Sequence, residues 1–73
     1  MNNNETTNSQ DKLDECARMT HTVVRQAMRV RHMTPQGALS FVAAETGESE
    51  DMVLAMLDRG LLLGLRPVIG LQR

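Results

Sequence analysis

The chain has 73 residues, of which 41% are hydrophobic and 23% charged, and its formal net charge is −1 at pH 7. This length fits one small domain and excludes a two-domain protein. Phe41 is the only aromatic residue, so a core must be built from Leu, Val, Met and Ala. Cys16 is the only cysteine, so no internal disulfide can form, and one Cys with two His cannot complete a structural zinc site. A core this thin leaves stability marginal and makes a protein partner a natural support.

The first ten residues are polar and rich in Asn. They cannot bury enough apolar surface to offset the entropy of ordering, so we predict a disordered tail at 1–10 and a single domain at 11–73. The tail also lacks a signal-peptide core, and the longest apolar stretch, 61–71, has about half the roughly 20 residues that a membrane-spanning helix needs. We therefore expect a cytoplasmic protein that makes no membrane contact.

The segment from Asp11 to Met33 contains neither Gly nor Pro, and its apolar residues recur at steps of three and four. This pattern predicts one long helix. Acidic residues lie near its start and Arg residues in its later turns, the order that complements the helix dipole. The expected inner face comprises Leu13, Cys16, Ala17, Val23, Val24, Ala27 and Val30.

Two shorter helices are predicted next, because capping residues punctuate the chain. Thr34 and Pro35 suit the start of a helix that ends near Thr46, before Gly47. Ser49 is the expected N-cap of a third helix, which we expect to end at Gly60. The inner faces of these two helices are expected to comprise Ala38, Leu39, Val42, Ala43, Met52, Val53, Met56 and Leu57. The methionines are expected to fill gaps in the core, or alternatively to form an adaptable surface for a partner.

The C-terminal segment 61–71 is predicted to form a short hairpin around Arg66-Pro67, or alternatively a fourth helix at 61–65. Seven of its eleven residues are Leu, Val or Ile. Because that is more apolar area than one face of a small core can cover, part of it is expected to be exposed as a contact surface. The fold class expected is mainly α, a compact domain of three helices with this hairpin or fourth helix.

Charge is segregated along the chain. Residues 16–33 hold four Arg, two His and no acid, whereas residues 34–58 hold five acids and neither Lys nor Arg. The spacing of Arg18, Arg25, Arg29 and His32 places them on one side of the first helix. These four residues form a basic ridge, which predicts docking of an acidic protein surface or phosphate; the alternative is a solvated helix face. Arg66 is a further candidate contact for a partner.

The pattern from Ala38 to Gly60 resembles the helix-turn-helix motif of transcription regulators. Ala43 matches the small residue between the helices, Gly47 matches the turn glycine, and Val42, Val53 and Met56 match buried positions. The resemblance implies a helix-turn-helix-like fold. Three acids, Glu48, Glu50 and Asp51, lie where a recognition helix would approach DNA phosphates, so direct DNA binding is the less favoured expectation.

Catalytic chemistry has no support in the sequence. Cys16 is expected to be a small buried residue, because no His or Asp stands at a spacing that would activate a thiol. His21 and His32 are expected to be surface groups about 16 Å apart along a helix, too far to share a metal ion. There is no Gly-rich phosphate loop. We predict a non-enzyme with no cofactor and no metal.

Taken as a whole, the chain resembles the small RNA-polymerase-binding regulators encoded by lytic Xanthomonas phages. The resemblance lies in the chain length, the Asn-rich start, the Arg-rich first helix and the stretch Thr34-Pro35-Gln36-Gly37-Ala38-Leu39-Ser40-Phe41. It implies a protein that docks on host RNA polymerase near the N-terminal part of the β′ subunit, inhibits σ-dependent initiation and promotes antitermination. The alternative is a small DNA-binding helix-turn-helix regulator.

Overall fold

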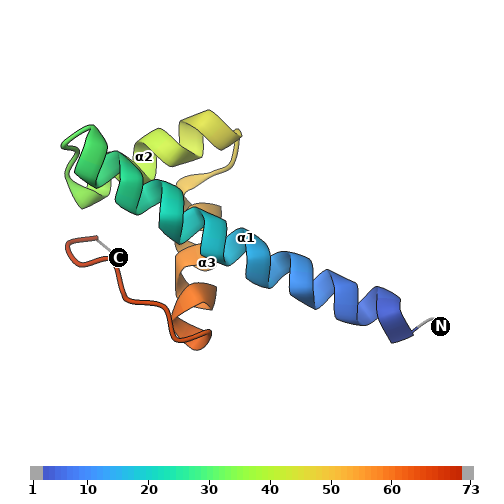
Figure 1. The fold of residues 1–73 in the computed structure, drawn as a ribbon. Helices are drawn as coiled ribbons and strands as arrows, with labels where there is room; N and C mark the ends of the chain where they lie inside the picture. The colour runs from blue at the N-terminus through green and yellow to red at the C-terminus, as the bar shows by residue number, and fades with distance from the viewer. Residues whose placement is uncertain (1–2, 72–73) are drawn as a thin grey trace.

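The computed structural model describes the backbone of residues 3–71 and the side chains of residues 9–71. Three helices follow one another, α1 (Asn3–Val30), α2 (Pro35–Thr46) and α3 (Glu50–Leu62), and each packs against the other two (Figure 1). Within residues 3–71 there is no strand. The mainly helical fold class is therefore confirmed.

α1 is the longest element, and its first turns project beyond the other two helices (Figure 1). It begins at Asn3, whereas the sequence predicted a start at Asp11 after a disordered tail; residues 1 and 2 lie outside the described residues. Gly and Pro are absent from the added turns, so nothing stops the helix there. Arg59 of α3 donates hydrogen bonds of 2.9 Å to Gln10 Oε1 and to Asp14 Oδ1. These contacts between distant parts of the chain hold the early turns of α1 against the end of α3.

α1 ends at Val30, three residues before the end of the segment without Gly or Pro at Met33. His32 adopts a left-handed backbone conformation with φ 57°, and the Met33 N–H donates to the Ala27 carbonyl over 3.4 Å. A non-Gly residue in this conformation costs roughly 1 kcal/mol, which the packing of α2 under α1 must offset.

The predicted caps of α2 and α3 are confirmed. Thr34 Oγ1 accepts a hydrogen bond of 3.0 Å from the Gly37 N–H at the start of α2. Ser49 Oγ accepts one of 3.1 Å from the Met52 N–H at the start of α3. Gly47, with φ 74°, ends α2 as expected. These local signals determine where the two short helices begin and where α2 ends.

The prediction that Gly60 ends α3 is wrong. α3 continues to Leu62, and Gly64, with φ 88°, follows its last turn. The Leu65 N–H donates to the Gly60 carbonyl over 2.9 Å, and the Gly64 N–H donates to the Leu61 carbonyl over 3.0 Å. This pair of bonds is the Schellman arrangement that ends a helix at a left-handed glycine. On local grounds, Gly60 and Gly64 could each end a helix. Gly60 instead lies within α3, where it packs against α1.

The C-terminal segment forms neither the expected hairpin nor the expected fourth helix. Leu61 and Leu62 complete α3, and residues 65–71 form an irregular segment without strand or helix. Val68 and Leu71 of this segment pack on the core, whereas Ile69 is exposed. The segment is therefore a coil that covers one edge of the three-helix core.

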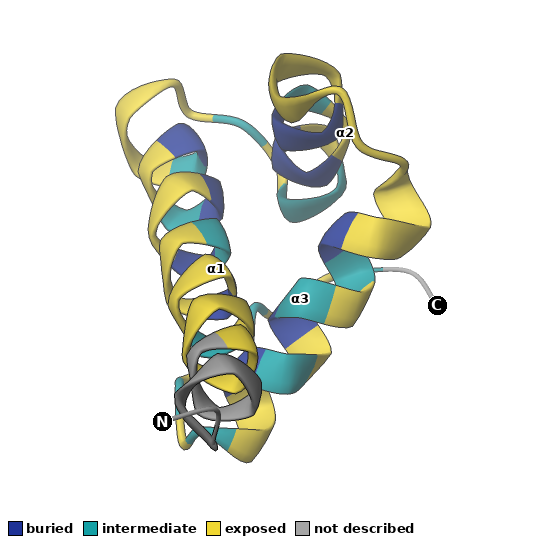
Figure 2. Ribbon diagram, turned by 90° about the vertical axis from the view of Figure 1, so that its right-hand side faces the viewer, coloured by how far each residue is buried: buried dark blue, intermediate teal, exposed yellow. Residues whose placement is uncertain are grey.

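The core lies where the three helices meet (Figure 2), and small side chains dominate it. Alanines contribute from α1 and α2, and the largest fully buried side chains are Leu39, Leu57 and Val24. Small residues let the helix axes approach closely, which compensates for the lack of large aromatic side chains. The buried apolar residues are Ala17, Val24, Ala27, Ala38, Leu39, Val42, Ala43, Val53 and Leu57.

His21 lies in this contact region, contrary to its predicted surface position, and is only 4% exposed. Its Nε2 lies 2.9 Å from the Leu57 carbonyl oxygen; because a carbonyl only accepts, Nε2 carries the hydrogen and donates it. Nδ1 is buried and has no hydrogen-bond partner among the described residues. A Cβ atom placed on Gly60 would lie 2.2 Å from His21 Nε2. The imidazole ring of α1 therefore occupies the space that a side chain at position 60 of α3 would need.

We expect Gly60→Ala to destabilise the fold by about 2 kcal/mol or more, because the new methyl group would force His21 out of its site. In an ordinary helix interior the same change stabilises by about 1 kcal/mol. Urea unfolding followed by circular dichroism at 222 nm measures the difference. The control is the double variant with His21→Ala, in which the cost of Gly60→Ala should largely disappear. A Gly60→Ala protein at least as stable as the parent would contradict the close contact.

Candidate functional site

The basic ridge of α1 is only partly free to bind a partner. Arg18 and Arg29 are exposed, and neither guanidinium group makes a hydrogen bond or ion pair with another described residue. They lie eleven residues apart on the same side of the helix, about 16 Å at 1.5 Å per residue. His32 is also exposed, at the left-handed turn after α1. Arg18 and Arg29 thus present positive charge to solvent, and no acid among the described residues forms an ion pair with either.

Arg25, in the middle of the ridge, has a structural partner that the sequence did not reveal. Its Nη2 donates to the carbonyl of Arg66, and it also donates to the carbonyl of Pro67 over 3.2 Å. The guanidinium group therefore ties α1 to the C-terminal segment. Arg66, the other predicted contact, lies beside the ridge because its carbonyl group accepts a hydrogen bond from Arg25. The Arg66 side chain is exposed. Of the predicted contact residues, the structure brings Arg25 and Arg66 together.

The acidic turn between α2 and α3 differs from a surface prepared for DNA. Glu48, Glu50 and Asp51 are all exposed there. Glu50 Oε2 accepts a hydrogen bond of 2.8 Å from Ser40 Oγ, which joins the two helices. The carboxylate of Glu48 makes no hydrogen bond or ion pair with another described residue, so its charge faces solvent. This end of α3 would repel phosphate groups.

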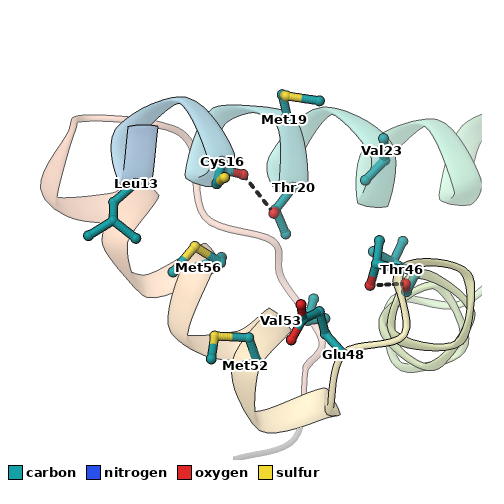
Figure 3. A pocket seen from close by; sticks show the side chains of 11 residues that line it. Leu13, Cys16, Met19, Thr20, Val23, Thr46, Glu48, Met52, Val53 and Met56 are labelled. Carbon is teal, nitrogen blue, oxygen red and sulfur yellow. Dashed lines mark hydrogen bonds between the residues drawn. The ribbon is translucent and has the colours of Figure 1, made fainter. Parts of the chain in front are cut away.

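A second surface, which the sequence analysis did not identify as a site, is an apolar groove between the three helices (Figure 3). Its volume is about 390 Å³. Met19 is 59% exposed and Met52 is 45% exposed at its walls, so both methionines are surface residues and not the expected core filler. The lining residues are Leu13, Cys16, Met19, Thr20, Val23, Val42, Thr46, Glu48, Met52, Val53 and Met56.

The groove exists because the apolar face of α1 is wider than the core. The expected inner face of the helix is correct for Ala17, Val24 and Ala27, but Leu13, Val23 and Val30 are exposed. The core occupies one side of the apolar stripe, and the other side is left facing the groove and the adjoining hollow over Phe41. The width of the stripe was visible in the sequence; which edge is covered depends on how α2 and α3 dock.

Cys16, expected to be buried, is exposed and lines the groove. No His lines the groove beside it, and the two described histidines lie elsewhere, His21 in the core and His32 after α1. Among the described residues, no three His, Cys, Asp or Glu side chains come together in a way that could hold a metal ion. The described helices also include none long and apolar enough to cross a membrane.

Comparisons with protein-family models, with curated proteins and with solved structures found no match to this chain. The functional argument therefore depends on the two surfaces of the chain itself, the basic ridge and the apolar groove.

We expect Arg25→Met to release the C-terminal segment while leaving the three helices in place, because the lost hydrogen bonds go to an irregular segment at the edge of the core. The loss in unfolding free energy should be about 1 kcal/mol. The heteronuclear {1H}–15N nuclear Overhauser effect should fall at residues 66–71. Arg18→Met is the matched control, since Arg18 makes no such bonds, and should leave these values unchanged. Equal values for both variants would show that Arg25 does not hold the segment.

Proposed function

We propose that this chain is a non-catalytic transcription regulator that binds bacterial RNA polymerase near the N-terminal part of the β′ subunit, inhibits σ-dependent initiation and promotes antitermination. The observation that supports a docking role is the ridge of α1, where Arg18 and Arg29 are exposed and unpaired within the described chain. The choice of polymerase as the partner follows from the resemblance of the whole chain to phage regulators of that enzyme.

Exposed arginines of this kind mainly speed the encounter with a partner and fix the orientation in which it binds. Arginine forms bidentate hydrogen bonds with carboxylate groups, and a row of them about 16 Å long matches an acidic protein surface. Arg25 is engaged by the carbonyl groups of the C-terminal segment, which leaves Arg18 and Arg29 as the arginines of the ridge that face solvent. A domain bound in this way can block one contact of the polymerase and stabilise another without any chemical step.

Direct DNA binding is the alternative, and the observation in its favour is the pair α2 and α3 joined by the short turn at Gly47. Three observations count against it. The acids of the turn are exposed, Glu50 accepts a hydrogen bond from Ser40, and none of the exposed arginines among the described residues lies on α3. A groove-reading helix needs basic or neutral residues where this chain carries acids.

We expect Arg18→Glu and Arg29→Glu each to weaken binding to purified Xanthomonas RNA polymerase by about 3-fold to 10-fold, because each replaces attraction by repulsion at the contact. Lys12→Glu is the matched control: it makes the same charge change on α1 outside the ridge and should change affinity less than about twofold. Biolayer interferometry at several salt concentrations measures the affinities, and circular dichroism checks the helices.

The same variants should lose inhibition of σ-dependent initiation and terminator read-through in transcription assays in proportion to lost binding. A salt-titrated binding assay on duplex DNA is run in parallel. Absence of polymerase binding by the parent protein would overturn the proposal. Tight, salt-dependent DNA binding would instead favour the helix-turn-helix alternative.

A further inference from the structure

The apolar groove is a surface separate from the basic ridge. The ridge residues lie on a different side of α1 from Leu13, Val23 and Met19, which form the α1 wall of the groove. The opposite wall consists mainly of Met52 and Met56 from α3 (Figure 3). The groove therefore opens between α1 and α3, and a partner could occupy it without touching the ridge.

The dimensions of the groove fit a short helix. Its α1 wall extends from Leu13 to Val23, a length of about 15 Å at 1.5 Å per residue. That length corresponds to about three turns of a partner helix. Sulfur-containing side chains, Cys16, Met19 and Met56, supply much of the lining. Methionine is unbranched and polarisable, and so adapts to apolar side chains of varied shape.

The polar groups of the groove favour an apolar occupant with a positive charge. Thr20 donates its hydroxyl hydrogen to the Cys16 carbonyl over 2.7 Å, and Thr46 donates to the Val42 carbonyl over 2.8 Å. Neither hydroxyl hydrogen is left for a polar ligand. Glu48 is the only charged side chain in the lining, and it has no partner among the described residues.

The electrostatic potential therefore differs along the groove. Glu48 lies at one end of the groove, in the turn between the C-terminus of α2 and the N-terminus of α3, and its carboxylate supplies the charge there. The adjoining hollow is lined by one acid and one base, Glu45 and Arg31, so Glu48 is the charge that distinguishes the groove. This end of the groove attracts a Lys or Arg side chain, or the positive N-terminus of a helix.

We propose that the apolar groove binds an amphipathic helix of another protein, about three turns long, whose apolar stripe packs on Met19, Met52 and Met56 and whose basic residue pairs with Glu48. Helix-in-groove recognition uses this combination of an apolar cleft and a charged rim. The inference does not require that the partner be RNA polymerase, so it stands or falls separately from the proposed function.

The test uses the full chain and two synthetic helical peptides of about 14 residues, one with a Leu stripe and Lys elsewhere, the other with the same stripe and Glu elsewhere. Titration followed by 1H–15N correlation spectra gives the affinity and the location of binding. The Leu–Lys peptide should shift the amide signals of the groove lining and bind at least about tenfold more tightly than the Leu–Glu peptide.

Two matched pairs of exposed-site variants keep the result interpretable. Met52→Lys should weaken binding of the Leu–Lys peptide about tenfold, whereas Leu62→Lys, at an exposed α3 position outside the groove, should change it less than about twofold. Glu48→Lys should reverse the preference between the two peptides, whereas Asp51→Lys, in the first turn of α3, should preserve it.

Three results would overturn the inference. The first is binding with no shift in the groove lining, and the second is an equal effect of Met52→Lys and Leu62→Lys. The third is a dimer in sedimentation equilibrium that Met52→Lys dissociates, because the groove would then be occupied by a second copy of the chain.

Discussion

α1 and α3 approach so closely at His21 that residue 60 has no space for a side chain, and the arrangement of the whole domain depends on this contact. The imidazole Nε2–H reaches the Leu57 carbonyl on α3, and the ring fills the space above Gly60. In a chain with almost no aromatic residues, one buried ring and several alanines set the helix separation. A bulkier residue at either position would spread the helices and open the small core.

The position of α3 on α1 decides which side chains are left at the surface. Because α3 docks on the side of α1 that carries Ala17, His21 and Val24, the adjacent apolar edge with Leu13 and Val23 faces the groove. The basic ridge lies on a different side of α1, where Arg25 donates hydrogen bonds to the C-terminal segment. Core packing and surface chemistry are thus coupled through one helix, and a change in helix docking would alter both.

The two candidate surfaces would contribute to binding in different ways. Exposed arginines act at long range and are screened by salt, so they direct encounter and orientation. An apolar groove acts only on contact, and burial of apolar area there slows dissociation. A small domain that carries both can capture a charged macromolecule and then hold a helix of it or of a neighbouring subunit. That division of roles suits a regulator that acts by occupying sites.

Sequence by itself determined the features that short-range physics controls. The capping residues Thr34 and Ser49, together with Gly47, placed the starts of the two short helices and the end of α2, and the apolar periodicity predicted a mainly helical fold. Charge segregation located the ridge. For the caps, the cause lies within a few residues of its effect, so a linear pattern contains it.

Only the tertiary structure decided between alternatives that are locally equivalent. Gly60 and Gly64 both suit a helix end, and contact with a distant His21 assigned the role to Gly64. The apolar stripe of α1 was wide enough to bury Cys16 or to expose it, and the docking of α3 exposed it. Arg25 was one of four equivalent ridge residues until carbonyl groups more than forty positions away took its hydrogen bonds. The physical reason is common to all three, since each outcome depends on contacts with residues far away in the sequence, and a local pattern does not contain that information.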